Sequence, residues 1–134
     1  MLKPPYVRVA VVDDHPQFRK CVRELLSADA GIMVVSEGGS ASAALEIARD
    51  VPVDLMLLDV SMPGSGLEAA RCIARDHPSI RVVMLSSSER LEDIAEALSA
   101  GVKAYVIKGI RGHELIELVR SIATTFLMLL TAGM

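Results

Sequence analysis

Several kinds of residue are scarce in this 134-residue sequence, and each scarcity excludes a class of protein. Tryptophan is absent and there are only two Phe and two Tyr, so aliphatic side chains must fill any hydrophobic core. The two cysteines, Cys21 and Cys72, lie far apart, without a CxxC pattern or a histidine at metal-ligand spacing. This argues against a disulfide scaffold and a zinc site, and we interpret both as reduced thiols in helices.

The sequence also lacks any block of basic residues. Its net charge is −3, with both signs scattered along the chain, so we expect no nucleic-acid contact through this chain itself. The apolar stretch near the N-terminus is too short for a signal peptide, and it runs straight into two acids. The apolar run from Phe126 to Leu130 is far shorter than the ~20 residues of a membrane span. We therefore expect a cytoplasmic protein that makes no use of a membrane.

What the sequence does contain is an alternation of two hydrophobic patterns. Short apolar runs rich in valine and isoleucine predict five strands, at Val7–Val12, Ile32–Val35, Val53–Leu58, Val82–Leu85 and Ala104–Ile107. Stretches with helical spacing predict helices near 16–27, 40–50, 67–76, 91–100 and from 112 onward. Such an alternation is typical of a parallel sheet covered on both faces. The prediction is one doubly wound α/β domain with five helices, in three layers α/β/α.

The predicted domain covers residues 6–125, a usual size for a single domain. Residues 126–134 form an apolar tail that we expect to extend the last helix. Phe126, Leu129 and Leu130 would then be partly exposed, which favours a partner surface there.

Polar residues stand where the predicted strands end. Asp13 and Asp14 follow the first strand, Asp59 the third, Ser86 the fourth and Lys108 the fifth. Parallel strands place their carboxyl ends along one edge of the sheet, where ligands bind in open α/β sheets. We therefore expect these five side chains to converge on one crevice.

Three neighbouring carboxylates repel one another, so this cluster requires a cation. Mg²⁺ is the natural partner, because it prefers oxygen ligands and binds one or two carboxylates while keeping waters. A carboxylate can also attack phosphorus to form an acyl phosphate, with the metal and the Lys108 ammonium offsetting charge on the transferring oxygens.

Four motifs carry a resemblance to a known family. VVDDHP, LLDVSMPG, VVMLSSS and AYVIKG, in that order, resemble the receiver domain of two-component response regulators. DDHP and the KGI sequence more narrowly resemble the receivers of the NarL/FixJ, or LuxR-type, transcription factors. The match runs from about Val7 to Ile122, and it implies a CheY-like fold with the flavodoxin-like strand order 2-1-3-4-5.

The resemblance implies a set of residues around the phosphoacceptor and the metal. Asp59 would accept the phosphoryl group and would also bind Mg²⁺. Asp14 would be a direct metal ligand, and Asp13 would act through water. The third protein ligand would be the backbone carbonyl of Ser61.

Three further residues would respond to the phosphoryl group. Ser86 and Lys108 would bond its oxygens. Ser86 would move toward it, and the ring of Tyr105 would turn into the vacated space. Phosphorylation would in this way shift the population between two packings of the domain.

The resemblance further implies a sensor histidine kinase as phosphodonor and a homodimer on phosphorylation. The domain would catalyse only its own phosphorylation and dephosphorylation. It would control an output, most naturally transcription through a DNA-binding domain that is not part of this sequence. A stand-alone receiver acting by protein contacts is the alternative. Two others are a phosphatase with an aspartyl nucleophile, for which Ser61 is a poor general acid, and a receiver that is never phosphorylated.

Some local features stay open at this stage. The loop after Asp59 is one residue shorter than the usual family form, and Lys108 is followed by Gly109 where many relatives have proline, which leaves the isomer of that bond open. Ser86 lies in a run of three serines, and Ser88 of this run is a candidate cap for the next helix. This makes the assignment of Ser86 as the switch hydroxyl less direct. His15 offers a transition-metal alternative, although one histidine among carboxylates matches a closed nitrogen and sulfur site poorly.

Overall fold

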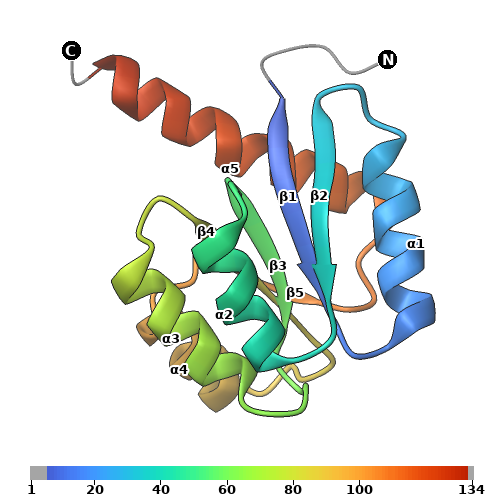
Figure 1. The fold of residues 1–134 in the computed structure, drawn as a ribbon, viewed down its shortest axis with the longest axis vertical. Helices are drawn as coiled ribbons and strands as arrows, with labels where there is room; N and C mark the ends of the chain where they lie inside the picture. Colours follow the sequence, from blue (N-terminus) through green and yellow to red (C-terminus); the bar gives the residue numbers. More distant parts are fainter. Residues whose placement is uncertain (1–5, 133–134) are drawn as a thin grey trace.

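The computed structural model describes the backbone of residues 6–132 and the side chains of residues 6–122. Strands and helices alternate along the chain (Figure 1). The strands are β1 (Val7–Val12), β2 (Ile32–Gly38), β3 (Leu55–Asp59), β4 (Arg81–Ser86) and β5 (Ala104–Ile107). The helices are α1 (Pro16–Ser27), α2 (Ala41–Asp50), α3 (Gly66–Asp76), α4 (Leu91–Ser99) and α5 (Gly112–Ala132). The sheet is parallel throughout, in the order β2-β1-β3-β4-β5, which confirms the predicted fold.

The sheet is buried on both faces because successive strand side chains point to opposite sides. Met56 and Leu58 pack on one face with buried residues of α2, α3 and α4. Leu55 and Leu57 pack on the other face with α1 and α5. Each fully buried aliphatic side chain contributes about 1.5–3 kcal/mol, so these two layers hold the carboxyl edge of the sheet in place.

The bounds of three strands differ from the predicted ones, and β4 (Arg81–Ser86) is longer than predicted by one residue at each end. The second strand was expected to end at Val35, but β2 continues to Gly38 because its polar end still pairs with β1 after a register shift between Val9 and Ala10. The third strand begins at Leu55 rather than Val53. It ends at Asp59, so the candidate phosphoacceptor is the last residue of the strand itself. For β2 and β3, backbone pairing, not apolar character, sets the boundary.

The helix α4 begins at Leu91 as predicted, but its cap differs from the expectation. The N-cap position is occupied by Arg90, whose side chain makes no capping hydrogen bond, and not by Ser88. Ser88 Oγ instead accepts a hydrogen bond from Arg90 N at 3.2 Å and donates one to Asp93 Oδ2 at 2.5 Å. The serine thus ties the loop between β4 and α4 to the first turn of the helix.

The last helix, α5, runs to Ala132, and its C-terminal end projects away from the sheet (Figure 1). The side chains of Phe126, Leu129 and Leu130, for which we expect a partner surface, lie outside the described residues. None of the helices within residues 6–132 combines the length and apolar character that crossing a bilayer requires.

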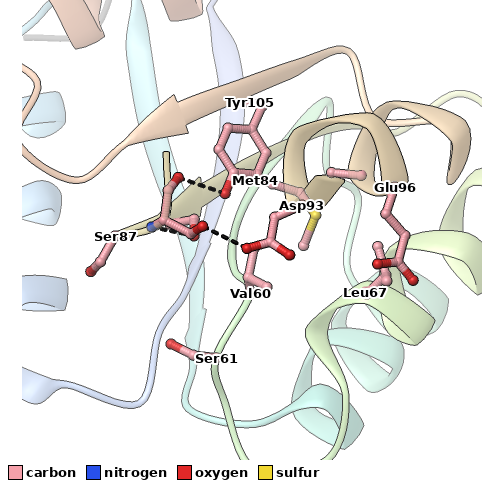
Figure 2. Close-up of a pocket in the computed structure, with 11 residues that line it drawn as sticks. Val60, Ser61, Leu67, Met84, Ser87, Asp93, Glu96 and Tyr105 are labelled. Atoms are coloured by element: carbon pink, nitrogen blue, oxygen red, sulfur yellow. Dashed lines mark hydrogen bonds between the residues drawn. The ribbon is translucent and has the colours of Figure 1, made fainter. Parts of the chain in front are cut away.

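A pocket of about 330 Å³ opens at the carboxyl end of β4, beside α3 and α4 (Figure 2). Serines 86–88 and Tyr105 line one side, and Leu67 and Ala97 line the helical side. Val60 and Ser61, directly after β3, also reach it, so the pocket borders the loop that follows Asp59.

Candidate functional site

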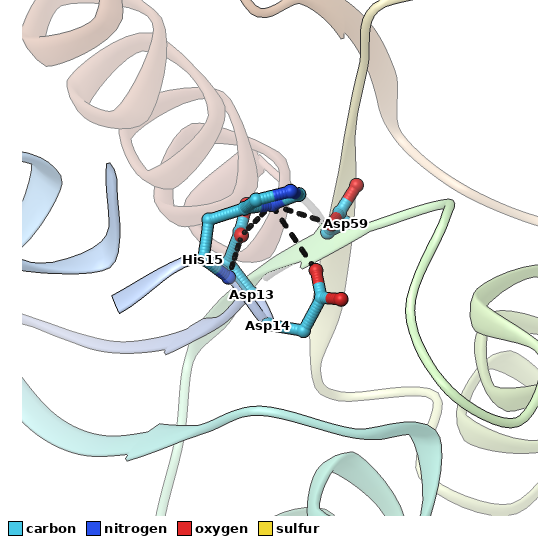
Figure 3. A group of neighbouring side chains, drawn as sticks. All are labelled: Asp13, Asp14, His15 and Asp59. Carbon is cyan, nitrogen blue, oxygen red and sulfur yellow. Dashed lines mark hydrogen bonds and ion pairs between the residues drawn. The ribbon is translucent and has the colours of Figure 1, made fainter. Parts of the chain in front are cut away.

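Three carboxylates and one imidazole meet at the carboxyl edge of the sheet (Figure 3). One potential ligand atom from each of Asp13, Asp14, His15 and Asp59 lies within 4.8 Å of the others. The strands β1 and β3 are neighbours, and this places the acids that end them side by side. Asp13 and Asp59 are fully buried, whereas the side chain of Asp14 is 29% exposed.

Lys108 supplies a positive charge to this cluster from the loop after β5. Its Nζ lies 2.9 Å from Asp13 Oδ2 and 3.3 Å from Asp59 Oδ1. The ammonium also lies over the ring of Phe18, 4.8 Å from its centroid, a favourable cation–π distance. Burial lowers the pKa of Lys108, but the carboxylates of Asp13 and Asp59 outweigh that effect and hold it above its ordinary value. The lysine is therefore a fixed cation at neutral pH.

The two carboxylate oxygens of Asp59 have different surroundings. Oδ1 contacts Lys108 and accepts hydrogen bonds from the backbone N of Ser61 at 3.2 Å and from its Oγ at 3.3 Å. Oδ2 is buried and accepts no hydrogen bond among the described residues. A buried oxygen without a partner is costly, so this atom is placed for a ligand or for chemistry.

The side chain of His15 approaches all three carboxylates through one ring nitrogen. Its Nδ1 is 3.0 Å from Asp13 Oδ1, 3.1 Å from Asp14 Oδ1 and 3.9 Å from Asp59 Oδ2. The side chain is 61% exposed, and its ring stands among the three acids in Figure 3. The imidazole nitrogen thus lies in the space between the carboxylates.

These residues are suited to a hard cation. Asp14 Oδ1 and Asp59 Oδ2 are buried oxygens that accept no hydrogen bond, although His15 Nδ1 lies 3.1 Å from Asp14 Oδ1. Asp13 Oδ2 has only the ion pair with Lys108. Carboxylate oxygens are the ligands of Mg²⁺ and similar ions. A divalent ion bound here would offset the mutual repulsion of the acids, which one lysine only partly compensates.

Ser86 and Tyr105 form a second group, which lines the pocket at the end of β4. Ser86 Oγ accepts a hydrogen bond from Ser88 N at 3.0 Å. The hydroxyl of Tyr105 donates to the carbonyl of Ser88 at 2.9 Å, so the ring faces the pocket (Figure 2). Both predicted switch residues therefore contact the same short loop. The backbone N of Lys108 donates to Ser86 O at 2.9 Å and connects this loop to the acid cluster.

Sequence reasoning missed three contributors to the site. One is Phe18, whose ring lies under the Lys108 ammonium, a contact that no sequence pattern indicates. Arg19 donates a hydrogen bond from Nη1 to the carbonyl of Asp13 at 2.6 Å. Its position one turn after the acid pair is the only hint the sequence gives. Asp93, in the first turn of α4, accepts a hydrogen bond from Ser88 Oγ, and no sequence motif singles it out.

Comparison with known proteins agrees with this geometry. Residues 9–120 match the response regulator receiver domain. The chain is 35% identical over 115 residues to the nitrate/nitrite response regulator protein NarP of Escherichia coli (strain K12), covering 85% of this chain and 54% of NarP. It is 36% identical over 117 residues to the response regulator UvrY of the same strain, covering 87% of this chain and 54% of UvrY. The chain thus spans about half the length of the curated relatives it matches.

Solved structures give the same picture. The signal receiver domain of the response regulator NarL from Mycobacterium tuberculosis is 33% identical, with a TM-score of 0.87, over 90% of this chain and 98% of that one. A LuxR-family two-component response regulator from Aurantimonas sp. SI85-9A1 is 29% identical, with a TM-score of 0.84, over 90% of this chain and 86% of that one. The chain belongs to the response regulator receiver domain family, in the branch of the NarL/FixJ, or LuxR-type, regulators.

Proposed function

We propose that this receiver takes a phosphoryl group onto Asp59, assisted by Mg²⁺, and that the modified state switches an output. The observation that carries the proposal is that the two carboxylate oxygens of Asp59 have different contacts. Lys108 and Ser61 engage Oδ1, while Oδ2 accepts no hydrogen bond among the described residues. One oxygen is therefore held in position, and the other is available as a nucleophile.

In the proposed step, Asp59 Oδ2 attacks the phosphorus of a phosphohistidine and forms an O–P bond. The P–N bond breaks, and its electron pair goes to the imidazole nitrogen of the donor. The Lys108 ammonium, 3.3 Å from Asp59 Oδ1, opposes negative charge on the transferring oxygens. The product is an acyl phosphate on Asp59.

The proposed cation site consists of Asp14 and Asp59 as direct ligands, the backbone carbonyl of Ser61, and Asp13 through water. The buried Asp14 Oδ1, which accepts no hydrogen bond among the described residues, supports this assignment. When bound, Mg²⁺ supplies Lewis-acid stabilisation of the phosphoryl oxygens and neutralises the acids.

The proposed switch uses Ser86 and Tyr105. Ser86 Oγ accepts its bond from Ser88 N, and its hydroxyl proton is free to be redirected to a phosphoryl oxygen. Movement of Ser86 would pull on Ser88, whose carbonyl accepts the Tyr105 hydroxyl. The pocket beside Tyr105 leaves space for the loop and the ring to repack.

The donor in this proposal is a sensor histidine kinase, and the setting is the cytoplasm. Phosphorylation would favour a homodimer, and the output would be transcription, as befits the branch to which the chain belongs. The catalytic activity of the domain would be limited to its own phosphorylation and dephosphorylation.

The test is mass measurement of the intact protein after incubation with acetyl phosphate and Mg²⁺, with Asp59→Asn as the control. We expect a single phosphoryl adduct on the parent and none on Asp59→Asn or in the presence of EDTA. An adduct that persists on Asp59→Asn would move the site elsewhere. Steady hydrolysis of a generic phosphate ester would favour the phosphatase alternative instead.

A further inference from the structure

Arg19 folds back from α1 over the loop that carries the acid pair. Its Nη1 donates a hydrogen bond to the carbonyl of Asp13 at 2.6 Å, and a longer one to the carbonyl of Gly38 at 3.4 Å. Its Nε lies 3.4 Å from Glu37 Oε1, which holds the other side of the guanidinium. The side chain is only 25% exposed, so it is packed against this loop rather than extended into solvent.

The peptide groups on both sides of Asp13 are therefore fixed. The backbone N of Asp13 donates to Gly38 O at 2.9 Å, and its carbonyl accepts from Arg19. That carbonyl belongs to the peptide that leads into Asp14. A fixed Asp13 carbonyl limits rotation of the backbone at Asp14, whose carboxylate is the proposed ligand of the cation.

The bond is of a strong type, because a charged donor roughly doubles the strength of a hydrogen bond to a neutral acceptor. The chain also leaves room for it. A Cβ at Gly39 would lie 3.2 Å from Arg19 Nη1, closer than ordinary contact, so glycine keeps this space open for the guanidinium.

From this geometry we propose that Arg19 is a positioning residue that sets the cation affinity of the acid pair. It does not touch the cation or Asp59. It acts by fixing the Asp13 carbonyl, and so the direction of the Asp14 carboxylate. The inference rests on the proposed function, in which Asp14 binds Mg²⁺.

Arg23 provides a matched control on the same helix. It lies one turn further along α1, and its Nη1 pairs with the same Glu37, at 3.1 Å from Oε2. Among the described residues, Arg19 is the side chain that donates a hydrogen bond to the Asp13 carbonyl, and Arg23 does not. Arg23→Met therefore removes a comparable charge and the pairing with Glu37, but leaves the hydrogen bond from Arg19 to the Asp13 carbonyl intact.

The experiment measures Mg²⁺ binding by titration calorimetry for the parent, Arg19→Met, Arg19→Lys and Arg23→Met. Loss of a group that orients a metal ligand weakens affinity by on the order of 10-fold, and we expect this for Arg19→Met. Arg19→Lys keeps a charged donor and should recover part of the loss. Arg23→Met should stay within about twofold of the parent, since it makes no contact with the loop.

A second readout separates positioning from general destabilisation. In phosphorylation by acetyl phosphate, Arg19→Met should need more Mg²⁺ for half-maximal rate, while the rate at saturating Mg²⁺ stays close to that of the parent. If Arg19→Met does not fold, Arg19→Lys against Arg23→Met decides the question, with the same direction and a smaller effect.

Two results would count against the account in different ways. A parent that binds Mg²⁺ and is phosphorylated, with equal affinities for the Arg19 and Arg23 variants, overturns the role of Arg19 alone. A parent that is not phosphorylated on Asp59 overturns the proposed function, and the role of Arg19 with it.

Discussion

At the scale of single residues, burial and pairing decide what each acid of the cluster can do. Asp13 and Asp59 are both fully buried, and each receives one contact from Lys108. Leaving a buried carboxylate without compensation costs several kcal/mol. The lysine therefore stabilises the site in the absence of a cation, while Asp14 and one oxygen of Asp59 stay available for a ligand.

The first prediction concerns His15, whose Nδ1 lies 3.0–3.9 Å from oxygens of three carboxylates. We expect His15→Ala to keep or increase Mg²⁺ affinity, because the ring occupies space between the ligands and Mg²⁺ prefers oxygen donors. Calorimetric titration with Mg²⁺ measures this. A loss of tenfold or more would instead make His15 a ligand, and would revive the transition-metal alternative for the site.

Lys108 gives a prediction on stability and its pH dependence. Lys108→Gln removes the partner of two buried carboxylates, so we expect a loss of about 2 kcal/mol in the free energy of unfolding at pH 7 without Mg²⁺. Because the folded state raises the pKa of Lys108, its contribution is complete below the ordinary lysine pKa of about 10.4. It is lost only as the pH rises through the folded value.

Urea unfolding of parent and variant between pH 7 and 11 checks this. The difference in stability should stay constant up to about pH 10 and shrink above it. A difference that has already vanished at pH 8 would mean that Lys108 is not the cation that stabilises these acids.

The residue types at this edge were predictable from sequence, but their contacts were not. Asp13, Asp14, Asp59 and Lys108 could be found because each follows an apolar run, and parallel strands bring such positions together. The bond from Arg19 to the Asp13 carbonyl depends on how a long flexible side chain folds back, which no sequence pattern encodes. The contact of Arg19 is therefore visible only in the folded structure.

At the scale of the elements, the entry into α3 is shaped by a close approach of backbone. A Cβ at Gly66, the first residue of α3, would lie 2.3 Å from the carbonyl oxygen of Asp59 and 2.8 Å from that of Val60. The neighbouring atoms are main chain and cannot give way as a flexible side chain would. The helix can begin against the end of β3 only if this residue is glycine.

We therefore expect Gly66→Ala to lower the free energy of unfolding by about 1–3 kcal/mol, and to slow phosphorylation because the Asp59 backbone must shift. Gly109→Ala is the control, because a Cβ there has nothing within 4 Å, and it should change stability by less than about 0.5 kcal/mol. Thermal or urea unfolding of both variants decides between them. Equal stability of Gly66→Ala and Gly109→Ala would refute the close approach.

The ends of helices and strands are predicted less well by sequence patterns than their existence and type. The polar end of β2 was missed because Ser36 and Glu37 carry no apolar signal, although their backbone pairs with β1. The existence and type of all five strands followed from apolar runs, which burial on both faces enforces. Boundaries depend instead on pairing with a neighbouring strand, which is a tertiary effect.

At the scale of the whole molecule, repulsion among the clustered carboxylates lowers the free energy of unfolding, and binding of a divalent cation raises it again. Three clustered carboxylates repel one another in the folded state and separate on unfolding. The folded domain binds a cation that the unfolded chain does not, so Mg²⁺ at 100 times its dissociation constant should add about 2.7 kcal/mol of stability.

Asp14→Asn tests this balance. Removing one charge should raise the melting temperature in EDTA by a few degrees, roughly 3–5 °C for about 1 kcal/mol, and should abolish the increase caused by Mg²⁺. Thermal unfolding followed by circular dichroism, with and without Mg²⁺, measures both. A variant less stable than the parent in EDTA, or one that still gains stability from Mg²⁺, would contradict the proposed role of Asp14.

The proposed phosphorylation of Asp59 can be tested by identifying the modified residue chemically. Acetyl phosphate and Mg²⁺ are applied, the acyl phosphate is reduced with borohydride, and the peptides are sequenced by mass spectrometry. We expect homoserine at position 59, at no other acid, and only when Mg²⁺ is present. Reduction at Asp13 or Asp14, or at no position in a folded domain, would contradict the proposed phosphorylation of Asp59.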